Sequence, residues 1–390
     1  MVSVLDAVLH ALSISFAMTW EILWALILGF TLSAVVQAVV SKAQMSRLLP
    51  DDSPRSLALA TLLGAASSSC SYAAVALARS LFQKGASFTA AMTFEIASTN
   101  LVIELGIILV ILMGWQFAAA EFVGGPIMII VLALLFRTFL KKQLVTEAHA
   151  QAEKGLRGYM EGHAGMDMSV SEGTFLRKIF SGRGFTAISH LFVMDWASVI
   201  RDIVLGLLIA GALAAWVPES FWKAFFLTDQ PQLALIWGPI VGPIVSVVSF
   251  VCSIGNVPLA AVLWNNGISF GGVISFIFAD LVILPIVSIK RRYYGRRMTV
   301  FLFVTFYAAM AAAGIIVELL FAALGLIPHE RNALVAEPSL SLNYTTVLNV
   351  AFLALAGVLL IRAWRTGGFA MLAMMDAKPS TAAQAGHAGH

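Results

Sequence analysis

Residues 233–263 read LALIWGPIVGPIVSVVSFVCSIGNVPLAAVL and contain no charged residue. A membrane-crossing helix needs about 20 residues, whereas this run has 31. Proline and glycine, which break or kink helices, interrupt it at positions that include Pro239, Gly242, Pro243, Gly255 and Pro258. The segment is therefore predicted to form a re-entrant hairpin that enters and leaves the membrane on the external side.

The whole chain has the composition of a membrane protein. Of its 390 residues, 60% are hydrophobic and only 12% are charged, against about 25% in an ordinary soluble domain. The net charge is only +3, and the basic residues lie between apolar runs, which argues against a nucleic-acid partner. The two cysteines are too few for a disulfide scaffold or a cysteine-rich zinc site.

Apolar runs long enough to lie in a bilayer recur along the chain. They cover residues 17–40, 57–81, 88–113, 116–140, 199–217, 233–263, 268–289, 298–325 and 344–363. Their hydrophobicity continues around the whole helix circumference, which predicts lipid-solvated helices. The fold class is therefore predicted to be an all-α polytopic membrane protein.

Lysine and arginine indicate the orientation of these helices, because cytoplasmic loops are enriched in both. Basic residues place 41–56 and 141–198 in the cytoplasm, together with the cluster Lys290, Arg291, Arg292, Arg296 and Arg297. Three apolar runs lie between the first two of these loops, so one of the three must return to its own side. We assign this second hairpin to 57–81, whose centre is small and polar. Seven spans remain, and the protein is expected in a bacterial inner membrane. Its N-terminus is expected outside and its C-terminus in the cytoplasm.

An internal repeat supports this topology. A shift of 182 positions superimposes Cys70 on Cys252, and the same shift pairs Ser71 with Ser253, Gly85 with Gly267, Ser87 with Ser269 and Phe88 with Phe270. The turn in the first copy carries Arg79 and Lys84, whereas its counterpart carries no charge. The two halves are therefore expected to face opposite ways, as in transporters built from inverted repeats.

These observations divide the chain into four parts. We expect a first membrane repeat at 1–140, a cytoplasmic loop at 141–198 and a second membrane repeat at 199–325. Residues 326–390 are expected to hold an external loop, a last transmembrane helix and a cytoplasmic tail.

Two short motifs resemble those of a known family. Cys70-Ser71 and Cys252-Ser253-Ile254-Gly255-Asn256-Val257-Pro258-Leu259, each followed by Gly-x-Ser-Phe, are similar to the twice-repeated Cys-Ser-Cys-Gly-x-x-Pro-Leu segments of the predicted-permease family that includes ArsP and YraQ. The similarity covers about residues 20–325. It implies a membrane permease, and ArsP members are efflux permeases for trivalent organoarsenicals. This chain has Tyr72 where a second cysteine is often found.

The cysteines and their neighbours are the predicted substrate contacts. Cys70 and Cys252 occupy equivalent repeat positions, and a pair of thiolates is a soft ligand set that selects thiophilic cations such as arsenic(III). The alternative is that each cysteine only packs at a helix break. The predicted substrate-binding residues are Cys70, Cys252, Ser69, Ser71, Ser253 and Asn256.

Acidic residues inside apolar runs are the predicted proton-coupling groups, because charge in hydrocarbon is costly and usually serves transport. Asp280 lies near the middle of 268–289, and the repeat places it on Ser98, one helical turn from Glu95. Asp280 and Glu95 are therefore predicted to flank one cavity. The alternative is a buried acid satisfied by serine or asparagine neighbours. Glu121 lies near the end of a run and is expected at the membrane interface.

The predicted cytoplasmic loop holds a further candidate site. His163, Met166 and Met168 are copper- and silver-compatible ligands in a glycine-containing segment. Such a segment could capture a metal loosely, or it could be an ordinary flexible linker.

The sequence therefore predicts a secondary-active permease that exports a small thiophilic solute, with a trivalent organoarsenical or related metalloid as the first choice and protons as the coupling ion. A soft-metal exporter for copper, silver or zinc and a passive channel are the alternatives. We expect no enzyme, because no histidine lies in a predicted span to serve as a base. No cofactor is expected, and the expected partners are the solute and the lipid bilayer.

Overall fold

The computed structural model describes residues 4–39, 49–68, 71–153, 175–249, 253–334 and 344–376. Within these ranges the regular elements are helices and there is no strand. The all-α prediction is confirmed for this part of the chain.

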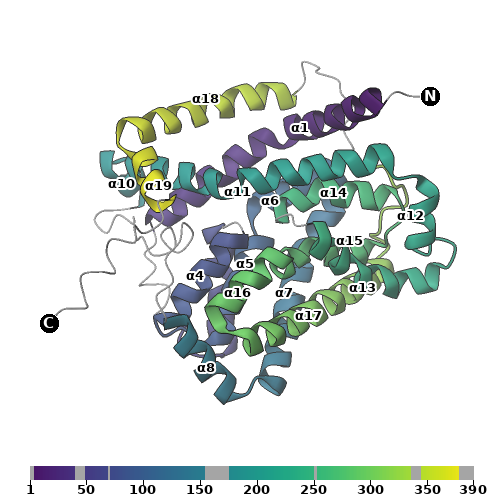
Figure 1. The fold of residues 1–390 in the computed structure, drawn as a ribbon, viewed down its shortest axis with the longest axis horizontal. Helices are drawn as coiled ribbons and strands as arrows, with labels where there is room; N and C mark the ends of the chain where they lie inside the picture. Colours follow the sequence, from purple (N-terminus) through teal and green to yellow (C-terminus); the bar gives the residue numbers. More distant parts are fainter. Residues whose placement is uncertain are drawn as a thin grey trace.

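Three long helices lie side by side along one edge of the molecule (Figure 1): α1 (Val4–Val39), α11 (Gly182–Trp216) and α18 (Tyr344–Arg365). Ser15 of α1 donates a hydrogen bond to the Leu207 carbonyl of α11 at 2.9 Å. The Asn349 side-chain amide of α18 accepts from the Trp24 backbone N–H of α1 at 2.9 Å and donates to the Trp20 carbonyl at 2.7 Å. Polar side chains thus join these three helices.

A second group of helices forms a bundle beside this layer (Figure 1). Its first half contains α3 (Pro54–Ser67), α4 (Ser71–Gln83), α5 (Phe88–Asn100), α6 (Ile103–Met113) and α7 (Trp115–Phe139). Its second half contains α13 (Pro231–Ser249), α14 (Ser253–Asn265), α15 (Phe270–Phe278), the 3-10 helix η1 (Ala279–Val282), α16 (Leu284–Tyr294) and α17 (Arg296–Ala323).

The element bounds follow the sequence repeat. Helices α4 and α14 begin 182 positions apart, at Ser71 and Ser253, and they also end 182 positions apart. Ser87 and Ser269, another equivalent pair, cap the N-termini of α5 and α15, where each hydroxyl accepts from a backbone N–H three residues later. The shift of 182 therefore relates helices as well as residues.

Both copies contain a broken helix where a single straight span was expected. The axis bends by 40° between α5 and α6, and by 44° between η1 and α16. The second break is at Ile283, directly before Leu284-Pro285, and proline cannot continue the hydrogen-bond ladder of a preceding helix. The shift of 182 maps Leu101, the C-cap of α5, onto Ile283. Residues 88–113 and 268–289 are thus two bent helix pairs.

The expected loop at 141–198 contains helices. It holds α8 (Lys142–Glu153), α10 (Phe175–Phe180) and the beginning of α11, which starts at Gly182 and not near residue 199. The Ser181 hydroxyl caps this helix by accepting from the Gly184 N–H at 3.0 Å. The short helices α12 (Glu219–Phe225) and α19 (Gly368–Asp376) complete the described fold. The cytoplasmic location of this region stays a prediction.

Three helices are long and apolar enough to cross a membrane, and five if each bent pair is one span, among the described residues. The three single helices are α7, α17 and α18. Each exposes large apolar side chains, among them Ile130, Val304 and Val347 at 59%, 58% and 66% exposure. Such surfaces suit lipid contact. The other spans of the seven-span topology remain predictions.

The two predicted hairpins, 57–81 and 233–263, each correspond to two helices. Helices α3 and α4 both pack on α5, and α13 and α14 both pack on α15. Ser68 at the first interruption has a positive φ of 38°, which places it in the left-handed region. Residues 69–70 and 250–252 lie outside the described part, so re-entry on one side stays a prediction.

Candidate functional site

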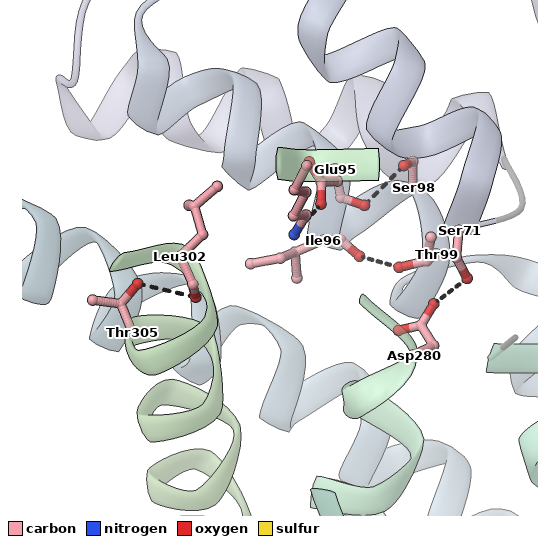
Figure 2. Close-up of polar contacts among 9 residues, drawn as sticks. Ser71, Glu95, Ile96, Ser98, Thr99, Asp280, Leu302 and Thr305 are labelled. Carbon is pink, nitrogen blue, oxygen red and sulfur yellow. Dashed lines mark hydrogen bonds and ion pairs between the residues drawn. The ribbon is translucent and has the colours of Figure 1, made fainter. Parts of the chain in front are cut away.

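Asp280 of the second half meets Ser71 of the first half in the interior. Asp280 lies in η1, at the break between α15 and α16, and Ser71 is the first residue of α4. The Ser71 hydroxyl donates a hydrogen bond to the Asp280 carboxylate at 2.6 Å (Figure 2), and both residues are fully buried. This hydrogen bond links the helix break of the second half to the beginning of α4 in the first half.

A buried ion pair forms a second link between the halves. The Lys290 ammonium of α16 lies 2.8 Å from a Glu95 carboxylate oxygen of α5. It also lies 4.0 Å from the centre of the Phe306 ring of α17, in cation–π geometry. Asp280 interacts electrostatically with both Lys290 and Glu95. We call Ser71, Glu95, Asp280 and Lys290 the central polar cluster.

Helix α5 carries Glu95 through the core, and two of its small polar side chains bond within the helix. All of its residues are buried. The Ser98 hydroxyl donates to the Glu95 carbonyl at 2.9 Å, and the Thr99 hydroxyl donates to the Ile96 carbonyl at 3.1 Å (Figure 2). These local bonds satisfy hydroxyls that would be costly to bury unpaired, and they leave the Glu95 carboxylate for Lys290.

Lys290 and Glu121 are both buried in the protein, which differs from what the sequence predicted. Lys290 was counted among basic residues of a cytoplasmic loop, but its side chain is 3% exposed and paired with Glu95. Glu121 of α7 was expected at the interface, but it is fully buried and interacts electrostatically with Asp280. Position near the end of an apolar run is a weak guide to burial when helices tilt and bend. The Gly124-Gly125 pair, one turn after Glu121, is a sequence signal of close packing.

Three of the predicted site residues, Ser71, Glu95 and Asp280, lie together in the central polar cluster. Asn256 of α14 is also buried, and it donates to the Ser246 hydroxyl of α13 at 3.2 Å. Ser253 is the first residue of α14, and its side chain is not described. Outside the described residues lie Ser69, Cys70, His163, Met166, Met168 and Cys252.

The described residues hold no group of three or more histidine, cysteine, aspartate and glutamate side chains that could bind a metal ion. The arrangement in the described core is instead one of paired and unpaired carboxylates, an ammonium group and hydroxyls. Such groups can hold and pass protons or bind a small cation.

Comparison with known proteins identifies the family of this chain. The model of a family described as predicted permeases, ArsP_1, matches residues 7–319. The chain is 65% identical over 378 residues to Rv2963 of Mycobacterium tuberculosis, a protein named as a permease, and the match covers 97% of this chain and 93% of that protein. No solved structure matches. The chain belongs to the ArsP_1 family of predicted permeases.

Proposed function

We propose that this chain is a secondary-active permease that uses a proton gradient to export a small thiophilic solute, with a trivalent organoarsenical or related metalloid as the first candidate. Family membership supports a membrane transporter and favours it over an enzyme. The observation that carries the proposal is the central polar cluster, which both halves build where a helix breaks. Buried ionisable groups and discontinuous helices are typical of transport pathways.

The transport mechanism in this proposal is alternating access of two inverted repeats. The equal bounds of α4 and α14 and the equivalent breaks at Leu101 and Ile283 support the repeat. Its inversion rests on the charge contrast between the two turns, one with Arg79 and Lys84 and the other uncharged. In such carriers one repeat rocks against the other around a fixed central site.

The choice of a thiophilic solute rests on the two cysteines. Cys70 directly precedes Ser71, whose hydroxyl bonds Asp280, and Cys252 directly precedes Ser253 at the beginning of α14. Thiolate ligands prefer soft cations over hard ones. Copper(I), silver(I) and zinc(II) remain the alternative cargo under the same proposal of thiol recognition.

Asp280 is the proposed coupling acid. The charge of Glu95 is compensated by Lys290 at 2.8 Å, whereas Asp280 accepts a hydrogen bond from the neutral Ser71 hydroxyl. A carboxyl group without a tightly held cation can gain and lose a proton during the transport cycle, and so change the charge of the cavity between its two orientations. Glu95 then serves mainly to hold Lys290.

Everted membrane vesicles with an imposed pH gradient test this proposal. Wild-type vesicles should accumulate methylarsenite(III) above its external concentration, and an uncoupler should abolish that accumulation. Asp280→Asn should lose uphill accumulation while it retains exchange of the solute, because the amide keeps the shape of the side chain but cannot carry the proton. Glu104→Gln, which changes another buried acid of the first half, is the matched control and should accumulate the solute normally.

Two outcomes would contradict the proposal. Uncoupler-insensitive uphill transport by Asp280→Asn would show that this residue is not the coupling acid. Wild-type equilibration of the solute without uphill accumulation would indicate a passive channel. Parallel assays with copper(I), silver(I) and zinc(II) decide the cargo, and uptake of a metal in place of the arsenical would replace the first candidate.

A further inference from the structure

Glu121 is a buried acid whose charge is not compensated by a contact. Its side chain is fully buried in α7, and neither carboxylate oxygen has a hydrogen-bond partner among the described residues. Burying an ionised carboxylate without a partner costs several kcal/mol. A carboxylate in this setting needs a bound cation or a proton.

Packing places Glu121 beside both helix breaks. Gly124 lies so close to the end of α15 that an added Cβ would be 3.0 Å from the Phe278 ring, and at Gly125 it would be 2.4 Å from the Leu101 side chain. Phe278 is the last residue of α15, and Leu101 is the C-cap of α5. Glu121 precedes these glycines by three and four positions, so it shares their face of α7.

Among the described residues, other helices bring oxygen atoms without hydrogen-bond partners close to Glu121. Asp280 interacts electrostatically with Glu121, and its Oδ1 atom has no hydrogen-bond partner among the described residues. Asn100, the last residue of α5, is fully buried, and its amide interacts with Asp280. The Asn100 Oδ1 atom is likewise without a hydrogen-bond partner in the described part of the chain. A helix C-terminus also carries a partial negative charge, which favours cations.

The charges of this region do not balance. Glu95, Glu121 and Asp280 are three carboxylates, and Lys290, the described ammonium group that acts on Glu95 and Asp280, is already 2.8 Å from Glu95. The buried Arg79 guanidinium donates to the Ala152 carbonyl and acts on Tyr294. Tyr294 also faces Glu95 and is neutral when protonated. Uncompensated negative charge among buried groups is relieved by a bound cation or a proton.

We propose that Glu121, Asp280 and Asn100 bind one small hard cation, H⁺ or Na⁺, between the two helix breaks. Carboxylate and amide oxygens are the ligands of hard cations, and broken helices bind coupling ions in this way in other carriers. For H⁺, the role of this cation as the coupling ion rests on the proposed function. Its binding does not.

Binding is measured on the purified full-length protein in detergent, without solute or gradient. One arm measures binding of ²²Na⁺ by equilibrium dialysis and the rise of the melting temperature when Na⁺ replaces choline at constant ionic strength. The other arm detects protonated carboxyl groups near neutral pH by their infrared C=O absorption. Both arms compare wild type with Glu121→Gln. The ²²Na⁺ arm adds Glu104→Gln as the matched control, because Glu104 is a buried acid that packs elsewhere, against Gly29 of α1.

A Na⁺ site should bind ²²Na⁺ about 10- to 100-fold more weakly in Glu121→Gln, the effect of losing one charged ligand, and normally in Glu104→Gln. Asn100→Ala, which keeps both carboxylates, should also weaken it. A proton site should instead show a protonated-carboxyl absorption that Glu121→Gln loses or shifts. The wild-type measurements remain informative if a variant does not fold.

The inference is overturned if wild type shows neither Na⁺ binding nor a protonated carboxyl group, or if Glu121→Gln binds ²²Na⁺ as wild type does and keeps the wild-type protonated-carboxyl absorption. A cation that binds at Glu121 while transport is uncoupled would overturn the proposed function alone. Coupled transport with no cation at Glu121 would overturn this inference alone.

Discussion

At the residue scale, the Lys290–Glu95 pair shows how the two halves depend on each other. The ammonium and the carboxylate lie 2.8 Å apart, and both side chains are almost completely buried. The Phe306 ring, 4.0 Å from the ammonium, adds a cation–π contact. A buried ion pair adds little net stability compared with an apolar pair, but removal of one partner leaves an uncompensated charge.

This asymmetry predicts the result of a double-mutant cycle. Glu95→Gln and Lys290→Met should each lower the free energy of unfolding by about 3–5 kcal/mol, whereas the double variant should lose much less than the sum of the two. Thermal unfolding of the purified variants in one detergent measures the three losses. Additive losses would show that the two side chains do not interact in the folded protein.

The cysteines allow a second prediction at this scale. If Cys70 and Cys252 bind one solute together, Cys70→Ser and Cys252→Ser should each weaken transport, and the double variant should be little worse than either single variant, because ligands of one centre act as a unit. Solute uptake in everted vesicles tests this. Wild-type uptake by the double variant would assign both cysteines to packing.

At the element scale, close contacts between small residues position the broken helices. A Cβ added at Gly271 of α15 would lie 2.1 Å from the Gly314 carbonyl oxygen of α17, and one added at Gly314 would lie 2.6 Å from the Gly271 carbonyl oxygen. Small residues at such crossings let helix backbones approach closely in membranes. This contact holds α15, and with it η1 and Asp280, against α17.

The crossing predicts that Gly271→Ala is disruptive. The added methyl group meets backbone, which cannot rotate away, so we expect a loss of about 1–3 kcal/mol or more in stability and impaired transport. Gly357→Ala in α18, where no atom lies within 4 Å of the added Cβ, is the matched control. It should be neutral or slightly stabilising, because alanine favours helix over glycine. Melting temperatures compare the two, and equal effects would contradict this account.

At the scale of the whole molecule, the proposed transport mechanism depends on the opposite orientation of the two halves. Lys84 lies at the turn between α4 and α5 and is exposed, and Asn266 lies at the equivalent turn between α14 and α15 and is half-buried. In an inverted repeat, these turns are on opposite sides of the membrane.

Cysteine labelling in a cysteine-free background tests this orientation. Lys84→Cys should react with an impermeant reagent only in everted vesicles, and Asn266→Cys only in intact cells, because the first turn carries Arg79 and Lys84 and the second carries no charge. Both variants have to be checked for insertion first. Labelling of both positions from the same side would contradict the inverted repeat.

Local features of the sequence were sufficient for the membrane class, the helical fold, the repeat and the family. Apolar runs identify lipid-solvated helices because no polar solvent replaces their backbone hydrogen bonds in the bilayer. Ser87 and Ser269 predict equivalent helix starts because an N-cap acts within three residues. Asp280 was recognisable as a candidate functional residue because an ionisable group in an apolar run is costly to bury in a membrane and usually serves transport.

Only the tertiary structure decided which charged groups meet. Lys290 and Glu95 are 195 positions apart, and Glu121 and Asp280 are 159 positions apart, so their interactions depend on how the two halves dock. A count of basic residues near helix ends treats Lys290 as solvated, whereas the bend of 44° before α16 accompanies its burial beside Glu95. Charge pairing across a core depends on three-dimensional distance, which local sequence does not encode.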